Sequence, residues 1–260
     1  FVIIDKRKKN TNLSKDQIIK ICNRKFISCD QLIIIKKSEI SDASLEFYNS
    51  DGGTSGACGN GTRCVANLLA KENNKNSITL TTLSGNLKSK ILEERIVSTE
   101  IGIGKTEWSE IPLSKNLNTN NLNIKITDED NNEHFGGAAI NVGNPHIIFF
   151  VDNYNNFNIE KIGPEIENHE FFPEKCNVTL ATIINKKLIK VKVWERGAGL
   201  TKACGTAACA TAFAAKKNHL VENKVDIEFS TGKLSISIDE NNSIHMKGPV
   251  SDIKNIEIKI

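Results

Sequence analysis

A repeated cysteine motif is the feature that most constrains the fold of this chain. Residues 57–64 read Ala-Cys-Gly-Asn-Gly-Thr-Arg-Cys, and residues 203–210 read Ala-Cys-Gly-Thr-Ala-Ala-Cys-Ala. In both stretches a cysteine and a glycine follow a glycine-rich loop and begin a run of small residues that favours a helix. The chain therefore places two cysteines, Cys58 and Cys204, at the beginnings of two similar helices.

The similarity extends to the segments on both sides of the motif. An expected strand ends nine residues before each cysteine, at Asn49 and at Glu195. After each helical run two strands follow, joined by a turn that contains Gly85 in the first half and Gly232 in the second. Matching elements at one offset predict two similar domains that derive from one duplicated ancestor.

The periodicity of apolar residues predicts the remaining elements. Ser14 is a candidate N-cap, and the alanine-rich helix after Cys204 is expected to be buried. The predicted helices cover residues 13–24, 58–71, 158–168 and 204–218. The predicted strands cover residues 1–5, 32–35, 45–48, 77–83, 86–92, 95–103, 136–142, 147–152, 177–185, 188–195, 225–230, 233–238, 243–247 and 253–260, and the polar stretch 105–133 is the expected crossover. We expect one domain at residues 1–105 with a returning C-terminal strand at 250–260, and the other at residues 106–249.

Composition excludes several classes of function. The net charge of +3 is small for 260 residues, and lysines alternate with acidic residues, so no basic face for nucleic acid is expected. No apolar run approaches the roughly 20 residues that a membrane span needs, which favours a cytoplasmic protein. Seven cysteines in a chain of this size indicate reduced thiols. Five of them are expected to pack as small hydrophobic residues: Cys22, Cys29, Cys64, Cys176 and Cys209.

A cysteine at the start of a helix has a defined chemistry. The free N–H groups there bind an anion and are expected to lower the pKa of a thiol from about 8.5 toward neutrality. Two such helix starts facing one carboxylate would let a thiolate remove a proton from the adjacent carbon while the opposite thiol returns one. The carbon would be inverted, and the backbone donors would hold the charge that develops on the carboxylate.

The motifs together resemble those of the diaminopimelate epimerase family. They are Cys-Gly-Asn-Gly-Thr-Arg-Cys at 58–64, Gly-Asn-Pro-His at 143–146 and Glu-Arg-Gly-Ala-Gly-Leu-Thr-Lys-Ala-Cys-Gly-Thr at 195–206, supported by Asp-Gln-Leu at 30–32 and Phe-Pro-Glu-Lys-Cys-Asn at 172–177. The resemblance covers essentially the whole chain. It implies an α/β (α+β) fold of two pseudo-symmetric domains, each a curved mixed sheet around a central helix. It also implies a homodimer with no cofactor and no metal.

The resemblance also implies an activity and a set of site residues. The reaction is the interconversion of LL- and meso-2,6-diaminopimelate, a small-molecule substrate on the route to lysine and peptidoglycan. Cys58 and Cys204 correspond to the two acid/base residues, and His146 and Glu195 are implied to tune their pKa values. The implied substrate contacts are Gln31, Asn49, Gly59, Asn60, Asn144, Asn177, Glu195, Arg196, Gly205 and Thr206.

Three features depart from the family pattern. A Gly-Asn-Asp segment that contributes a substrate-binding asparagine is expected just before Phe1, so we expect an N-terminal segment to be missing. Gly53 and Thr54 stand where serine and glutamate are usual, and Ala207 stands where glycine is common. The missing segment is expected to weaken substrate binding, whereas neither of the two sequence changes involves a proton-transfer group.

Three alternatives remain open. A related racemase acting on proline, hydroxyproline or another amino acid would keep both cysteines, although the asparagines favour a substrate with a polar distal end. A zinc-binding protein would favour C-x2-C pairs, which the spacings of the two motifs do not give. A thiol-disulfide exchanger would need C-x-x-C, which is absent, but oxidation is expected to join Cys58 to Cys204.

Overall fold

The computed structural model describes residues 1–8, 12–23, 27, 29, 31–56 and 58–258. It divides into two compact units, one formed by Phe1–Glu100 with Gly248–Ile260 and the other by Ile101–Lys247. We call them unit 1 and unit 2. Among the described residues, no helix is long and apolar enough to cross a membrane.

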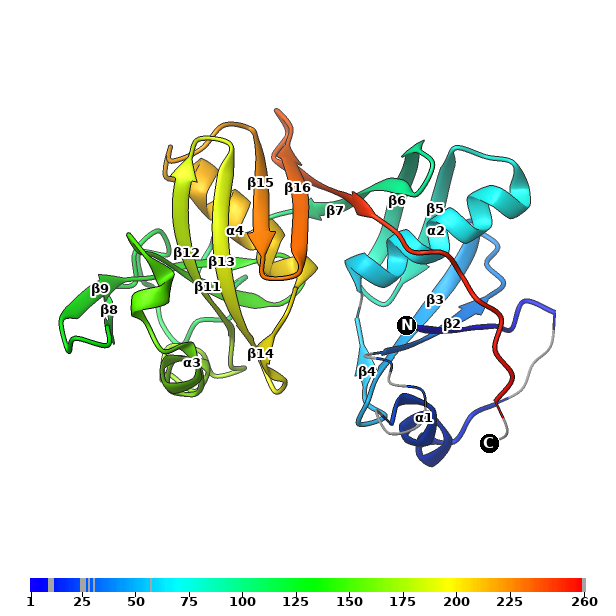
Figure 1. Ribbon diagram of the computed structural model, residues 1–260, viewed down its shortest axis with the longest axis horizontal. Coiled ribbons are helices and arrows are strands. Elements are labelled where there is room, and N and C mark those ends of the chain that lie inside the picture. The colour runs from blue at the N-terminus through cyan, green and yellow to red at the C-terminus, as the bar shows by residue number, and fades with distance from the viewer. Residues whose placement is uncertain (9–11, 24–26, 28, 30, 57, 259–260) are drawn as a thin grey trace. The chain divides into compact units, whose positions relative to one another are not determined.

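Unit 1 is built on a mixed sheet whose strands run in the order β1-β2-β3-β5-β6-β7 (Figure 1). The pairs β1/β2 and β3/β5 are parallel, and the pairs β2/β3, β5/β6 and β6/β7 are antiparallel. The strands are β1 (Val2–Asp5), β2 (Gln31–Lys36), β3 (Ala43–Asn49), β5 (Ser77–Thr82), β6 (Gly85–Glu93) and β7 (Ile96–Ile103), and the short β4 (Thr54–Ser55) pairs with β3. The helices are α1 (Lys15–Cys22) and α2 (Gly59–Asn73).

Helix α2 forms the centre of the unit 1 core. Its buried residues Val65, Ala66 and Leu69 belong to one apolar cluster with residues of the sheet, including Ile33 and Phe47. The helix ends at Asn74, whose φ of 51° is the left-handed conformation that commonly terminates helices. The apolar face of α2 therefore fixes its position in the core, and the cap at Asn74 fixes where the helix ends.

Unit 2 repeats the same plan. Its strands run in the order β17-β16-β15-β13-β12-β11-β10, and the pairs β11/β12 and β13/β15 are again the parallel ones. The strands are β10 (Ala138–Asn141), β11 (Pro145–Phe150), β12 (Asn177–Asn185), β13 (Leu188–Glu195), β15 (Lys224–Phe229), β16 (Gly232–Ile238) and β17 (Ser243–Pro249), and the short β14 (Gly199–Thr201) pairs with β13. The helices are α3 (Ile159–Glu167) and α4 (Gly205–Lys217), with a 3-10 turn at Tyr154–Asn156.

Helix α4 lies in the middle of unit 2 (Figure 1). It contacts β10, β11, β12, β15 and β16, and its residues from Ala207 to Ala215 are all buried. A helix that is buried on every side is apolar on every side, and its alanine side chains let the surrounding strands approach closely. A second apolar cluster contains Ile162 and Ile166 of α3 together with Phe149 and Leu180 of the sheet. The sheet therefore has helices packed against both of its faces.

The predicted mixed α/β fold is confirmed, and the four predicted helices and most predicted strands are present with shifts of a few residues. The prediction of a strand over residues 253–260 is wrong for residues 253–258, which form no strand, and residues 259 and 260 lie outside the described part of the chain. The crossover 105–133 contains a strand that was not predicted, β8 (Ile124–Thr127), which pairs with β9 (Glu133–Gly136). The predicted domain boundaries stay a prediction.

Candidate active site

Cys58 is the N-cap of α2 in unit 1. Its backbone is extended, with φ −141° and ψ 108°, and its Sγ accepts a hydrogen bond from the N–H of Gly61 at 3.4 Å. Burial raises the pKa of this half-buried thiol to about 11, although the N–H groups of Gly61 and Asn60 and the charge of Arg63 oppose the shift. The expected lowering of this pKa is therefore wrong, because desolvation outweighs the helix donors.

Cys204 holds the equivalent place at the start of α4 in unit 2. Its φ of −138° and ψ of 118° closely match those of Cys58, and its side chain is 6% exposed. Burial is the main reason that the pKa of Cys204 is raised, and the nearby Glu195 carboxylate raises it further. Thr206, with its Oγ1 3.4 Å from the Cys204 Sγ, opposes the shift. Here too the expected lowering of the pKa is wrong, for the same physical reason.

His146 lies completely buried on β11 of unit 2. Its Nε2 is 2.9 Å from Oδ1 of Asn144, and its buried Nδ1 has no hydrogen-bond partner among the described residues. Burial, reinforced by the positive charge of Arg196, lowers the pKa of His146 to about 3. The imidazole is therefore neutral at physiological pH.

Asn177 and Arg196 link β12 to the turn that follows β13. The Nδ2 of Asn177 donates to the carbonyl of Pro145 at 2.9 Å, and its Oδ1 accepts the backbone N–H of Arg196 at 3.0 Å. The Nη1 of Arg196 donates to the carbonyl of Glu174 at 2.7 Å. Unit 2 thus links His146 to Asn144 and Asn177 to Arg196, and it places Glu195 and Thr206 beside Cys204.

The remaining predicted residues belong to unit 1. Gln31 and Asn49 are directly opposite in the β2/β3 pair, and the Nε2 of Gln31 donates to Oδ1 of Asn49 at 2.8 Å. Asn60, in the first turn of α2 after Gly59, accepts a hydrogen bond from Nη2 of Arg63 at 3.0 Å.

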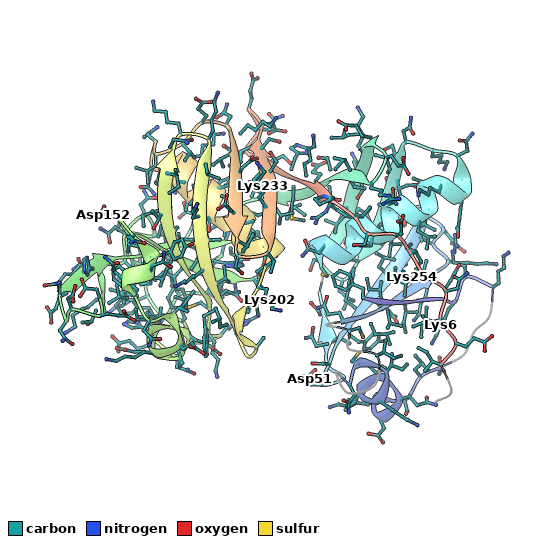
Figure 2. The ribbon with its side chains drawn as sticks, viewed as in Figure 1. Lys6, Asp51, Asp152, Lys202, Lys233 and Lys254 are labelled. Carbon is teal, nitrogen blue, oxygen red and sulfur yellow. The ribbon has the colours of Figure 1, made fainter. Side chains whose placement is uncertain are left out.

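The glycine-rich loops precede the two cysteines. The loop between β3 and β4 contains Asp51, labelled in Figure 2, whose Oδ1 accepts the N–H of Gly53 at 2.7 Å. Lys202, also labelled in Figure 2, directly follows β14 in the second loop. Asp30 and Ala57 of the quoted motifs lie outside the described residues.

The other five cysteines pack as predicted. Cys22, Cys29, Cys176 and Cys209 are buried, and the partly buried Cys64 packs against the unit 1 core. All seven cysteines are free thiols, so the Cys58–Cys204 disulfide under oxidation stays a prediction. Within the described part of the chain, no group of three or more His, Cys, Asp or Glu side chains is placed to hold a metal ion.

Sequence reasoning missed Glu167. The residue is 5% exposed at the end of α3, and its carboxylate accepts hydrogen bonds from Trp194 and Gly197, which flank the predicted site residues Glu195 and Arg196. The sequence carries no signal for it, because its donors lie 27 and 30 residues away along the chain.

Solved structures of low sequence identity share this fold. A PhzF-family phenazine biosynthesis protein of Bacillus anthracis matches with a TM-score of 0.68 and 14% identity, over 99% of this chain and 92% of that one. A hydroxyproline epimerase of Agrobacterium vitis, solved with bound trans-4-hydroxy-L-proline, matches with a TM-score of 0.64 and 12% identity, over 90% of this chain and 77% of that one. The fold is therefore that of the PhzF and proline racemase-like proteins, here with a cysteine at the start of one helix in each unit.

Sequence comparison identifies the family within this fold. A model of the diaminopimelate epimerase family matches residues 1–107 and 138–253. A diaminopimelate epimerase of Pelagibacter ubique (strain HTCC1062) is 70% identical over 260 residues, which cover 100% of this chain and 95% of that protein. One of Acidiphilium cryptum (strain JF-5) is 37% identical over 252 residues, covering 96% and 89%. The chain belongs to the diaminopimelate epimerase family, a family of isomerases.

Proposed function

We propose that this chain interconverts LL- and meso-2,6-diaminopimelate without a cofactor, with Cys58 and Cys204 as the two acid/base residues. The observation that carries the proposal is the matched placement of the two thiols. Each is the N-cap of the long helix of its unit and has nearly the same backbone conformation, in a chain 70% identical to a diaminopimelate epimerase. The product would serve the synthesis of lysine and peptidoglycan.

The proton balance of the reaction requires one thiolate and one thiol. The thiolate takes the proton from the carbon beside a substrate carboxylate and becomes a thiol. The electron pair of the broken C–H bond is delocalised into that carboxylate, and the second thiol gives its proton to the opposite face of the carbon. The carbon is inverted, the two cysteines have exchanged protonation states, and no electrons are transferred to or from the protein.

The helix starts supply the stabilisation that this reaction needs. The first N–H groups of α2 and α4 lack partners within their helices and can donate to an anion such as the one that develops on the carboxylate. Gly59 and Gly205 are the first residues of these helices, so no side chain blocks the approach of the substrate to the N–H groups. Donors fixed before the reaction lower the barrier because they need not reorganise as charge develops.

The raised thiol pKa values make ionisation part of substrate binding. Both thiols are neutral at pH 7, because burial raises the pKa of Cys58 to about 11 and raises that of Cys204 as well. The ammonium group of a bound amino acid would stabilise a nearby thiolate, so one thiol would release its proton to solvent on binding. Glu195 favours the neutral form of Cys204, and the neutral His146 holds the Asn144 side chain in place.

The other predicted contacts suit the distal end of diaminopimelate. This end carries a second carboxylate and a second ammonium group, which need a fixed cation and several neutral hydrogen-bonding groups. Arg196 is the cation, and a guanidinium can bind a carboxylate through two parallel hydrogen bonds. Gln31, Asn49, Asn60, Asn144 and Asn177 are the neutral groups. This set favours diaminopimelate over proline-type substrates, which lack a second charged end.

Deuterium incorporation tests the reaction and the residues together. We would incubate the protein with LL-diaminopimelate in D2O and follow deuterium at Cα together with the ratio of stereoisomers. Cys58→Ala and Cys204→Ala should both abolish epimerisation, whereas the matched control Cys64→Ala, on the same helix as Cys58, should retain it. Epimerisation that survives either of the first two substitutions would refute the two-thiol mechanism. An unsubstituted protein that epimerises proline or hydroxyproline but not diaminopimelate would refute the proposed substrate.

The assembly and the compartment are also part of this proposal. Seven free thiols are stable in a reducing compartment, which supports a cytoplasmic location. The family resemblance supports a homodimer.

A further inference from the structure

A buried carboxylate joins helix α3 to the end of β13. The Oε2 of Glu167 accepts a hydrogen bond from Nε1 of Trp194 at 2.7 Å, and its Oε1 accepts the backbone N–H of Gly197 at 3.1 Å. Between these two donors lie Glu195 and Arg196, the residues to which the proposed function assigns contacts with Cys204 and substrate. A buried carboxylate must have hydrogen-bond partners, so its position and theirs are fixed together.

The surroundings of Glu167 make this connection rigid. Gly163 lies one turn earlier on α3, and a Cβ added there would overlap the Trp194 ring, so the helix backbone lies directly against the indole. Among the described residues, Lys175 forms an ion pair with this carboxylate, with its Nζ 3.9 Å from Oε1 and its side chain largely exposed. A lysine at this distance in solvent contributes little, so the two N–H donors are the main partners of Glu167.

Two consecutive backbone N–H groups of the turn are held by side chains from elsewhere in unit 2. Arg196 donates its N–H to Asn177, and Gly197 donates its N–H to Glu167. Asn177 is a predicted site residue, and Glu167 accepts the backbone N–H of the next residue in the turn in the same way that Asn177 accepts that of Arg196. Without the carboxylate, the turn would keep only one of these two attachments.

We propose that Glu167 is a positioning residue for the reaction, whose carboxylate fixes residues 195–197 so that Glu195 stays beside Cys204 and Arg196 stays available to the substrate. The part concerning substrate rests on the proposed function. The part concerning Cys204 does not, because the hydrogen bonds and the Glu195–Cys204 interaction are formed by the chain's own residues.

The first test measures how the alkylation of the Cys204 thiol depends on pH, with no substrate added. Alkylation by iodoacetamide would be followed by mass spectrometry across pH in the full chain, with Cys58 in the same sample as the internal reference. Glu195 on β13 is the charged side chain that raises the pKa of Cys204, and Thr206 on α4 is the polar side chain that opposes it. Releasing the turn in Glu167→Ala should lower the pH midpoint of Cys204 alkylation by about one unit, the size of a typical single-charge effect.

Two further variants separate positioning from simple stabilisation. Glu167→Gln keeps an acceptor oxygen for one of the two donors and should give a smaller shift of the midpoint. Ser89→Ala removes a buried side-chain hydrogen bond to Thr99 of 2.7 Å in unit 1 and should leave the Cys204 midpoint unchanged. An unchanged midpoint in Glu167→Ala would overturn the proposal, because a merely structural residue would lower stability without moving it.

The epimerase assay then separates this proposal from the proposed function. We expect kcat/KM for LL-diaminopimelate to fall by about tenfold or more in Glu167→Ala and to be unchanged in Ser89→Ala. A shifted Cys204 midpoint in a chain that epimerises proline or hydroxyproline but not diaminopimelate would refute the proposed function and leave the positioning role standing. An active chain whose midpoint and kcat/KM are both insensitive to Glu167→Ala would refute the positioning role alone.

Discussion

Acidification should destabilise unit 2 through His146. The side chain is completely buried, and burial lowers its pKa from the ordinary 6.5 to about 3. Below pH 6.5 the unfolded chain binds a proton at this residue, whereas the folded chain does not until the pH approaches 3. The stability that neutral His146 contributes is thus present above pH 6.5 and is lost as the pH falls. Between pH 6.5 and pH 5 the loss is about 2 kcal/mol, at 1.36 kcal/mol for each pH unit.

Urea unfolding followed by tryptophan fluorescence measures this loss. The chain has two tryptophans, Trp108 and Trp194, and both belong to unit 2, so the signal reports the unit that contains His146. The comparison is between the unsubstituted protein and His146→Gln, each at pH 7 and at pH 5. His169, whose pKa burial also lowers, is present in both proteins, so its contribution cancels in the difference.

The result that matters is the difference in pH dependence, not the absolute stability. His146→Gln is expected to lower the free energy of unfolding at pH 7, because the hydrogen bond to Asn144 is disturbed. On going to pH 5 the substituted protein should lose about 2 kcal/mol less than the unsubstituted one. Equal losses would refute the reasoning, and so would an NMR titration of the His146 ring with a midpoint near 6.5.

Two further predictions concern packing and capping. Gly163→Ala should destabilise unit 2 by about 2 kcal/mol, because the new methyl group would overlap the Trp194 ring, and fluorescence-detected urea unfolding would show it. An unchanged midpoint would mean that α3 can move away from the ring. Ser14→Ala should lower the stability of unit 1 by about 1 kcal/mol, because it removes the Ser14 Oγ that accepts the N–H of Gln17 at 3.2 Å. Circular dichroism would measure it, and no loss would mean that the cap is replaced by solvent.

Local signals in the sequence predicted local structure well. The serine expected to cap the first helix does so and forms a reciprocal capping box with Gln17, which donates and accepts within one turn. The alternating residues at 253–258 were misleading, because they form no strand in the structure. Alternation shows that a segment can present two different faces, but a strand also needs a partner for its backbone groups, and the sequence does not reveal one.

In the candidate site, too, the sequence predicted the local features but not those that depend on tertiary packing. Cys58 and Cys204 could be selected from sequence because each follows a glycine-rich loop and begins a helix, and the helix starts are present as predicted. The direction of their pKa shifts could not be predicted. Helix donors are a property of the local chain, whereas desolvation depends on everything packed around the sulfur, and in this protein desolvation dominates.

The sequence alone determined the internal repeat, the two cysteine-led helices and the family, since these are recorded in spacing, periodicity and motif. Tertiary structure alone decided that His146 is neutral, that both thiols are protonated at neutral pH, and that Glu167 accepts a hydrogen bond from the turn that contains Arg196. The physical reason is distance along the chain. Caps and amphipathic patterns act over a few residues. Burial, and the hydrogen bond that the N–H of Gly197 donates to Glu167, 30 residues earlier in the chain, exist only once the chain has folded.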